Sequence, residues 1–248
     1  MSRLLAVVYG GACYTAFLVA FLYAMAFVAG VGAPKHIDNG ANAPLAVALA
    51  IDVALLALFA VQHSGMARPA FKRWWTRFVP PPIERSTFVL VSSLVLLLLF
   101  WQWRPLPQPV WQVEHGLFRG VLWAVSMLGW LLVLVSSFAI NHFELFGLRQ
   151  VWLHRQRRET NKDEPFVVRA MYRIVRHPLM LGFLIAFWVT PTMSVGHLLF
   201  AAVVTGYIFV AVKFLEERDL IAVHGDAYRE YQRKVPMLLP GRKRPPIR

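Results

Sequence analysis

Long apolar runs alternate with short polar segments along most of the chain, a pattern typical of a multi-pass membrane protein. Four of these runs approach the length of about 20 residues that a helix needs to cross a bilayer. The third run is predicted to begin at the possible capping residues Ser86 and Thr87 and to end in the interfacial residues Trp101 and Trp103. The four predicted spans cover about 4–32, 44–63, 86–103 and 117–140.

The last apolar stretch, at about 179–213, is too long for a single span. It is interrupted by Pro191 and Gly196, and a proline removes a helical hydrogen bond and clashes with the preceding turn. We therefore predict a helical hairpin with short arms at about 179–193 and 197–214. The predicted fold class is an all-α integral membrane protein with about four transmembrane helices plus this Pro-broken hairpin.

The composition agrees with this pattern. Hydrophobic residues make up 58% of the chain and the mean hydropathy is +0.52, whereas a soluble domain is about 45–50% apolar. Charged residues make up 16%, against about 25% in an average soluble domain. The first apolar run, from Leu4 to about Val31, is far longer than the roughly 7–15 residues of a signal-peptide core, so we interpret it as a retained transmembrane helix.

The distribution of positive charge predicts how the spans are oriented. The net charge is +13, and Lys and Arg concentrate in the segments 64–85 and 142–178 and in the tail from Glu216. The positive-inside rule then places both termini and both basic loops in the cytoplasm, in a multi-pass protein of the cytoplasmic membrane. Membrane lipid is an expected partner, whereas nucleic acid is not, because the basic residues follow topology rather than one folded face. The opposite loops carry only Lys35, Arg104 and Arg119.

The segment RHPLMLGF, at 176–183, joins a basic loop to the hairpin and is the first candidate for chemistry. Pro178 suits the first turn of a helix, whose unpaired N–H groups then lie beside His177. Gly182 allows another backbone or a flat ligand to approach closely. The competing interpretation is an interfacial anchor in which Arg176 reaches lipid headgroups. The residues alone leave both interpretations open.

The motif KFLEERDL follows the hairpin directly. If the hairpin folds back, Glu216 comes near His177, where a carboxylate can bind ribose hydroxyls or a cationic group. The alternative is a solvated helix end formed by Glu216 and Glu217. Acids at a helix C-terminus oppose the macrodipole, so a stabilising partner such as Arg218 is expected.

A third motif, GDAYREYQRKVP, places Tyr228 and Tyr231 on one helix face, where they either line a pocket or cover the membrane interface. Together with R-H-P-x-x-x-G and E-E-x-x-L it forms an ordered set over roughly 140–240. This set resembles the membrane methyltransferases of the isoprenylcysteine carboxyl methyltransferase and phospholipid methyltransferase type. The resemblance implies S-adenosylmethionine as the cofactor, held without a Rossmann fold between the loop before RHP, the hairpin and the tail.

The resemblance also implies which residues contact the cofactor, with Glu216 closing the site. Relatives usually have Tyr where this chain has Met180, so a backbone contact can survive there but a hydroxyl contact cannot. The implied cofactor-binding residues are Tyr172, His177, Pro178, Leu179, Met180, Gly182, Glu216, Glu164, Phe166, Val167 and Gln156.

The N-terminal half narrows the resemblance. The chain is similar to the bacterial methanethiol S-methyltransferases, and more loosely to the membrane proteins called NnrU, in VQHSGMARPAFKRWW, PPIERSTFVL, LLFWQWRP and INHFELFG. The implied reaction transfers a methyl group from S-adenosylmethionine to methanethiol, a small volatile thiol, at the cytoplasmic face, and gives dimethyl sulfide. The implied division is a four-helix transmembrane region at 1–141 and a loop, hairpin and tail at 142–248 that form the cofactor site.

Methylation of a thiol needs a base, because the thiolate is the nucleophile and a nearby histidine can take its proton. His63 ends the second predicted span and His142 follows the fourth, so both are candidate catalytic residues, although a histidine at the membrane boundary is often structural. Arg68, Glu84 and Arg85 either close the site or pair with each other, and pairing is favoured for Glu84. No metal is expected. The candidate substrate-side residues are Asn141, Arg68, Tyr228 and Trp101, of which Trp101 is alternatively an interfacial belt residue.

Two other functions remain open. The first is the same type of enzyme with another methyl acceptor, such as a prenylcysteine carboxylate, a lipid amine or hydrogen sulfide. The second is a non-enzymatic NnrU-like membrane protein in which His63, His142 and His197 ligate haem or a metal. His197 belongs near the outer side in the predicted topology, so these three histidines are not expected to share one site. The sequence predicts no oligomeric state.

Overall fold

The computed structural model describes residues 2–158, 168 and 170–241. The chain divides into two compact units that interleave along the sequence. The predicted division at 141/142 separates a transmembrane region from a cofactor-binding region, and it stays a prediction. Unit 1 contains the described residues of 1–112, 142–160 and 192–203. Unit 2 contains those of 113–141, 161–191 and 204–248.

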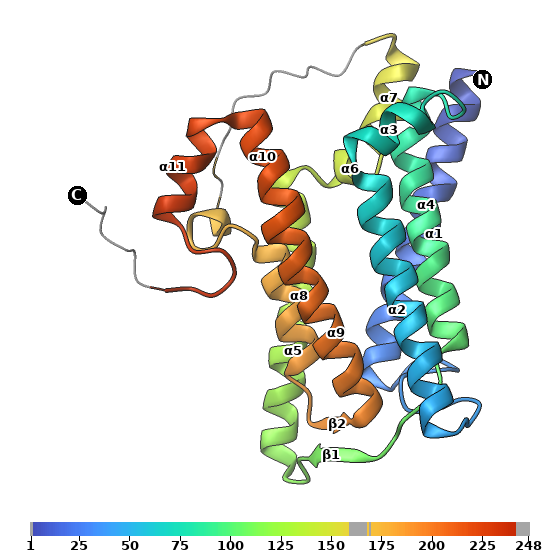
Figure 1. Ribbon diagram of the computed structural model, residues 1–248, viewed down its shortest axis with the longest axis vertical. Coiled ribbons are helices and arrows are strands. Elements are labelled where there is room, and N and C mark those ends of the chain that lie inside the picture. The colour runs from blue at the N-terminus through green and yellow to red at the C-terminus, as the bar shows by residue number, and fades with distance from the viewer. Residues whose placement is uncertain (1, 159–167, 169, 242–248) are drawn as a thin grey trace. The chain divides into compact units, whose positions relative to one another are not determined.

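Unit 1 is built on three long helices that run side by side (Figure 1): α1 (Arg3–Ala29), α2 (Leu45–Ala67) and α4 (Pro81–Gln102). The Ser2 side chain caps the first turn of α1, and Gly30 ends the helix in the left-handed conformation with φ 71°. Three short helices gather at the end where α1 begins: α3 (Pro69–Trp75), α6 (His142–Leu145) and α7 (Leu148–Gln156).

The start of α4 differs from the prediction, and so does the environment of Trp103 at its end. The helix begins at Pro81 rather than at 86, because a proline in the first turn costs no helical hydrogen bond. Ser86 and Thr87 therefore lie inside the helix and do not cap it. Trp103, which ends the helix, is 0% exposed, and its Nε1 donates to Ile37 O at 3.1 Å. The interfacial position predicted for Trp103 is therefore wrong, because its ring is part of the core.

The other end of unit 1 gathers the connections between helices. Strand β1 (Pro109–Gln112) follows α4 and pairs antiparallel with β2 (Thr192–Ser194), which directly precedes α9 (Val195–Val210). The Ser194 hydroxyl donates to the Asp38 carboxylate in the α1–α2 connection. Three connections far apart in the sequence therefore meet at one end of the helices, opposite α3, α6 and α7.

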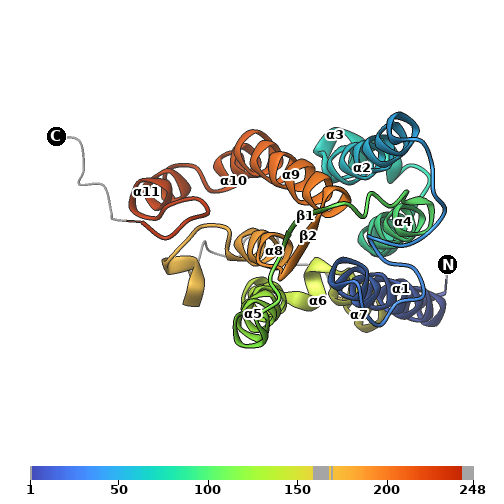
Figure 2. The ribbon, with the colours of Figure 1, turned by 90° about the horizontal axis from the view of Figure 1, so that it is seen from below.

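Unit 2 is centred on α5 (Gly116–Ile140) and α8 (Pro178–Trp188), which pack side by side (Figures 1 and 2). Their backbones touch where both helices have glycine: a Cβ added at Gly182 would lie 2.7 Å from Gly129 O. Small residues allow such close packing between membrane helices. The close approach predicted at Gly182 is therefore present, and the approaching backbone is that of α5.

The second arm of the predicted hairpin is much longer than expected. α9 continues through a π-helical turn (Ala211–Glu216) into α10 (Glu217–His224), and the continuous helix has 30 residues. The predicted end at 214 is wrong, because the acids that follow are neutralised by distant partners and do not end the helix. After Gly225 the chain forms α11 (Asp226–Lys234).

Five helices of the described chain are long and apolar enough to cross a membrane. They are α1, α2, α4, α5 and the helix from Val195 to His224. α8 has 11 residues and is shorter than a span. The protein is therefore an all-helical, multi-pass membrane protein, with one more span-length helix than the sequence pattern predicts.

Candidate active site

Glu217 is the centre of a polar cluster in unit 2. The residue is 6% exposed. Its Oε1 accepts a hydrogen bond from Arg176 Nε at 2.7 Å and lies 2.7 Å from Arg176 Nη2 in an ion pair. The Tyr228 hydroxyl donates to the same oxygen at 3.5 Å, and Gln232 Nε2 donates to Oε2 at 3.0 Å. A buried carboxylate needs these partners, because an unpaired charge is costly away from water.

Arg176 also ties the cluster to the C-terminal segment. Its Nη1 donates to Gln232 O at 3.0 Å and to Val235 O at 2.6 Å. Its backbone N–H donates to Pro236 O at 2.9 Å. The side chain is 10% exposed. The alternative interpretation of Arg176 as a lipid-headgroup anchor is therefore wrong, because the guanidinium group points into the protein.

His177 lies at the N-cap of α8 between two carboxylates. Its Nδ1 is 3.5 Å from Glu216 Oε1, and its Nε2 is 3.3 Å from Glu217 Oε1. Burial alone would lower the pKa of His177, but hydrogen bonds to Glu216 and Glu217 and their negative charges raise this pKa to about 9. The imidazole is therefore protonated at neutral pH and cannot act as a base there.

Glu216 is the exposed acid of the pair, with a side-chain exposure of 46%. Its Oε1 faces His177, while Oε2 has no partner among the residues that the structure describes. Burial raises the pKa of the nearby Tyr172 phenol, and the charge of Glu216 adds to this effect. The fold therefore brings Glu216 to His177 as predicted, and it leaves the other carboxylate oxygen of Glu216 open.

Tyr228 and Tyr231 face inward from α11, at 1% and 8% exposure. They pack with Leu220 of α10 in one apolar cluster. The Tyr231 hydroxyl donates to Tyr172 O at 2.5 Å, which fixes the short 3-10 turn Ala170–Arg173 against α11. The alternative in which these tyrosines cover the membrane interface is therefore wrong.

The remaining predicted cofactor residues lie in different segments of the chain. Pro178, Leu179 and Met180 form the first turn of α8, with Pro178 in the predicted position. Their contacts with a cofactor stay a prediction. Gln156 lies exposed at the end of α7 in unit 1, and Glu164, Phe166 and Val167 lie outside the described residues.

His63 lies near the end of α2 and is half-buried. Its Nδ1 is 3.2 Å from Ser92 Oγ of α4, which also accepts a hydrogen bond from Gln62 Nε2 at 3.3 Å. The imidazole ring lies between the rings of Phe59 and Phe88, with centroids 5.3 and 5.0 Å away. Within the described chain, His63 Nε2 has no hydrogen-bond partner, so it can accept a proton in the tautomer that carries its hydrogen on Nδ1.

His142 is held differently, at the start of α6. The residue is 3% exposed, and its Nε2 is 2.8 Å from the hydroxyl of Tyr14 in α1. The Phe146 ring packs against the imidazole, with centroids 4.8 Å apart. Burial lowers the pKa of His142, so the ring is neutral at neutral pH. The nitrogen that faces Tyr14 is already engaged within the fold.

The other predicted residues, which are candidates for the substrate side of the site or for closing it, lie on or at the ends of α2, α4 and α5. Glu84 is 9% exposed and forms an ion pair with Lys72 at 3.7 Å, so it is paired as predicted, but the partner is Lys72 rather than Arg68 or Arg85. Arg68 Nε donates to a backbone carbonyl of α2 at 3.3 Å, and Asn141 ends α5. Trp101 is 68% exposed at the opposite end of α4 from Glu84, which favours its alternative role as a belt residue.

Sequence reasoning missed the structural roles of Glu217, Ser92 and Tyr14. A sequence signal exists for Ser92, because a hydroxyl inside an apolar span commonly faces a polar partner on another helix. The sequence signal for Glu217 is weaker. Glu216 and Glu217 are adjacent acids of one motif, and the motif does not indicate which of them has the structural role. No local pattern marks Tyr14.

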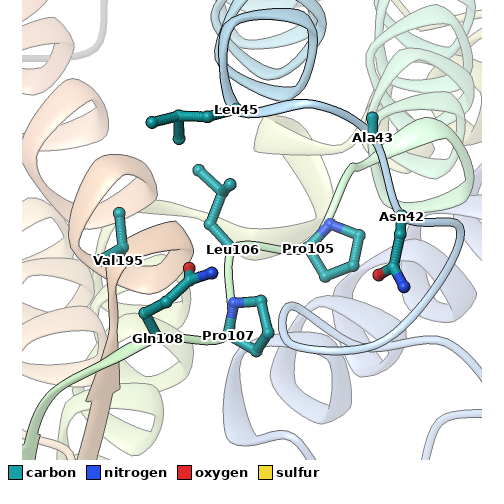
Figure 3. Close-up of a pocket in the computed structure, with 8 residues that line it drawn as sticks. All are labelled: Asn42, Ala43, Leu45, Pro105, Leu106, Pro107, Gln108 and Val195. Atoms are coloured by element: carbon teal, nitrogen blue, oxygen red, sulfur yellow. The ribbon is translucent and has the colours of Figure 1, made fainter.

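A separate pocket lies at the end of unit 1 where the connections gather (Figure 3). Its volume is about 660 Å³. The pocket begins beside Leu45, and at 1.5 Å per residue His63 lies roughly 27 Å further along α2. The pocket is therefore separate from the residues around His63. It is lined by Asn42, Ala43, Leu45, Pro105, Leu106, Pro107, Gln108 and Val195.

Known proteins resemble this chain over nearly its full length. A protein of Mycobacterium tuberculosis named methanethiol S-methyltransferase is 56% identical over 97% of this chain and 98% of its own length. Methanethiol S-methyltransferase 1 of Bradyrhizobium diazoefficiens is 54% identical over 97% of this chain and 84% of its own length. Nurim of Sus scrofa is 31% identical over 70% of this chain and 68% of its own length.

No solved structure matches the chain. The family model described as NnrU protein matches residues 53–237, a stretch that includes the His63 cluster, the RHP segment and the two acids. The chain therefore belongs to the NnrU protein family, together with the bacterial proteins named methanethiol S-methyltransferase.

Proposed function

We propose that this protein is a thiol S-methyltransferase that converts methanethiol to dimethyl sulfide with S-adenosylmethionine as the methyl donor. The observation that carries the proposal is the 56% identity, over 97% of the chain, to the Mycobacterium tuberculosis protein named methanethiol S-methyltransferase. Similar identity to the Bradyrhizobium diazoefficiens protein supports the same acceptor. These relatives favour methanethiol over a prenylcysteine carboxylate, a lipid amine or hydrogen sulfide.

The cluster around the RHP segment fits S-adenosylmethionine, which supplies a methyl group on a positively charged sulfur. The open oxygen of Glu216 can accept hydrogen bonds from ribose hydroxyls or from an amino group. Protonated His177 holds the other carboxylate oxygen in place. The N–H groups of Leu179 and Met180, in the first turn of α8, have no partner within the helix and suit a polar ligand.

In unit 1, His63 is the stronger candidate for the base. If Nδ1–H donates to Ser92, the lone pair lies on Nε2, which has no partner in the described part of the chain. His142 already uses its Nε2 in the contact with Tyr14. We therefore assign proton removal from the thiol to His63 and a supporting role to His142.

We further propose that the protein lies in the cytoplasmic membrane with both termini in the cytoplasm. The basic segments 64–85 and 142–178 support this orientation. The pairing of β1 with β2 supports it independently, because it brings the α8–α9 connection to the same end as the α1–α2 and α4–α5 connections. Although α8 alone is shorter than a span, the segment from α8 through β2 then counts as a crossing, and with the five span-length helices it makes six crossings, which leave both termini on one side.

The test is an assay with the purified protein, S-adenosylmethionine and methanethiol. We expect dimethyl sulfide in the headspace and an equal amount of S-adenosylhomocysteine in solution. Parallel reactions with a prenylcysteine, an amine lipid and hydrosulfide compare the acceptors. Calorimetry with S-adenosylmethionine tests the cofactor separately, and a lack of binding would rule out the methyltransferase assignment.

A further inference from the structure

Arg85 is a half-buried cationic side chain near the start of α4, at the end of the basic segment 64–85. Its Nε donates to Leu145 O at 2.8 Å. Its Cζ lies 4.9 Å from the centroid of the Phe88 ring, so the guanidinium group is held over the ring face. Nη1 and Nη2 donate to no group in the described part of the chain.

The acids near Arg85 are paired with other cations. Glu84 Oε2 lies 3.7 Å from Lys72 Nζ, and the Glu144 carboxylate forms an ion pair with Arg149. Neither acid lies within ion-pair distance of Arg85, although both act on its charge at longer range. Within the described residues, the Arg85 charge is therefore without a directly bound anion.

The groups beside Arg85 are incompletely paired as well. The Phe88 ring contacts both the guanidinium group and the imidazole of His63, with separations of 4.9 and 5.0 Å. Gln62 Oε1 is fully buried and has no hydrogen-bond partner among the described residues. Ser92 Oγ joins Gln62 and His63 through hydrogen-bond contacts of 3.3 and 3.2 Å. The guanidinium group of Arg85 and the imidazole of His63 therefore lie against one aromatic ring, and Ser92 links the buried acceptor of Gln62 to that imidazole.

We propose that these five residues of α2 and α4 form the acceptor site, and that Arg85 binds a small alkyl thiol there as its thiolate. The inference rests on the proposed function, because it names the residue that holds the acceptor of that reaction. The guanidinium N–H groups donate to the sulfur, and the methyl group of methanethiol packs on Phe88. The site members are Gln62, His63, Arg85, Phe88 and Ser92.

The ionisation step is balanced within this cluster. The S–H bond breaks, its electron pair stays on sulfur, and the proton passes to Nε2 of His63, whose Nδ1–H donates to Ser92. Before the proton is transferred, Gln62 Oε1 can accept a hydrogen bond from the S–H group of the entering thiol. A neighbouring arginine stabilises the thiolate relative to its thiol, because its positive charge attracts the anion.

The experiment measures methanethiol binding to the purified protein without a methyl donor. The ultraviolet absorbance of the thiolate is recorded against pH, with thiol-free protein as the blank. For the wild type we expect the bound thiol to ionise at least about one pH unit below free methanethiol. Arg85→Gln should return the midpoint to that of the free thiol and weaken binding at least about tenfold. Arg85→Lys, which keeps the charge, should give intermediate values.

Arg73→Gln is the matched control, because Arg73 is an exposed arginine of α3 in the same unit. It should leave the titration unchanged. Thermal unfolding and calorimetry with S-adenosylmethionine show whether each variant is folded. An unchanged midpoint in a folded Arg85→Gln protein would overturn the proposal, since a purely structural arginine does not change the ionisation of the thiol.

A second measurement decides the matter if Arg85→Gln does not fold. Iodide is a monoanion close to methanethiolate in size and polarisability, and it should compete with methanethiol for the wild-type protein. Binding of methanethiol that iodide does not affect would contradict the proposal. Thiolate binding without any dimethyl sulfide formation would instead contradict the proposed function and leave the anion site in place.

Discussion

Arg176 and Glu217, which are 41 positions apart, meet at a single oxygen: Nε and Nη2 of the arginine both lie 2.7 Å from Glu217 Oε1. The pair joins the RHP segment to α10 and, through the backbone contacts of Arg176, to the C-terminal segment. Glu216, one position earlier, is 46% exposed and keeps an open oxygen. These adjacent acids therefore have different roles: Glu217 holds the site together, and Glu216 offers an oxygen to a ligand.

This difference predicts opposite results for two matched substitutions. Glu217→Gln should lower the free energy of unfolding by about 3 kcal/mol, because it leaves Arg176 and His177 without their buried counter-charge. Glu216→Gln should leave the melting temperature nearly unchanged and weaken S-adenosylmethionine binding about tenfold or more. Thermal unfolding and calorimetry on both variants check this. Equal losses of stability would contradict the assignment.

Stability should fall as the pH rises through the folded pKa of His177. This pKa is about 9, against 6.5 for the unperturbed side chain, so protonation favours the folded state. The contribution, at most about 3 kcal/mol, is fully present below pH 6.5 and is lost as the pH passes 9. The melting temperatures of wild type and His177→Gln should therefore converge between pH 6.5 and 9. A gap that stays constant would show that the imidazolium does not provide this stability.

A methyl group at Gly182 should force α5 and α8 apart. Its Cβ would lie 2.7 Å from Gly129 O, so Gly182→Ala should destabilise the protein by about 1–3 kcal/mol. Gly206→Ala in α9 is the control, because nothing lies within 4 Å of a Cβ there. That change should be neutral or slightly stabilising, since alanine favours a helix. Thermal unfolding of both variants measures the difference.

The two histidines of unit 1 should differ in their effect on turnover. His63→Ala should lower the rate at neutral pH about 100-fold or more with S-adenosylmethionine affinity retained, as expected on loss of a general base. His142→Ala should mainly lower stability, because it removes the contact with Tyr14 and opens a packed aromatic cluster. Rates of dimethyl sulfide formation at several pH values make the comparison. If both variants keep the full rate at neutral pH, neither residue is the base.

The sequence predicted what depends on local composition. A run of apolar residues has to span the bilayer wherever it lies in the fold, so α1, α2 and α5 begin and end close to the predicted positions. Pro178 likewise begins α8, because a proline is favoured at the first helical position in any context. The proximity of Glu216 to His177 also followed from the hairpin pattern and the proline that interrupts it.

The features that the sequence did not reveal depend on distant partners. The helix after Val195 continues past its acids because Arg176 and His177 neutralise Glu217 from another part of the chain. Trp103 is buried because the α1–α2 connection covers it, and no pattern near Trp103 indicates that contact. The open cation Arg85 is recognisable only once both neighbouring acids are seen to pair elsewhere.

The pairing of Trp111 in β1 with Met193 in β2 has a consequence for how the chain matures at the ribosome. Synthesis runs from the N-terminus, so β1 emerges long before the strand that completes it, and its edge stays unpaired in the interval. α5, the loop after it and α8 must all be made before β2 arrives. The β1–β2 pair therefore forms only after α8 has been synthesised, although β1 belongs to the first half of the chain. A chain that stops after α8 leaves β1 unpaired.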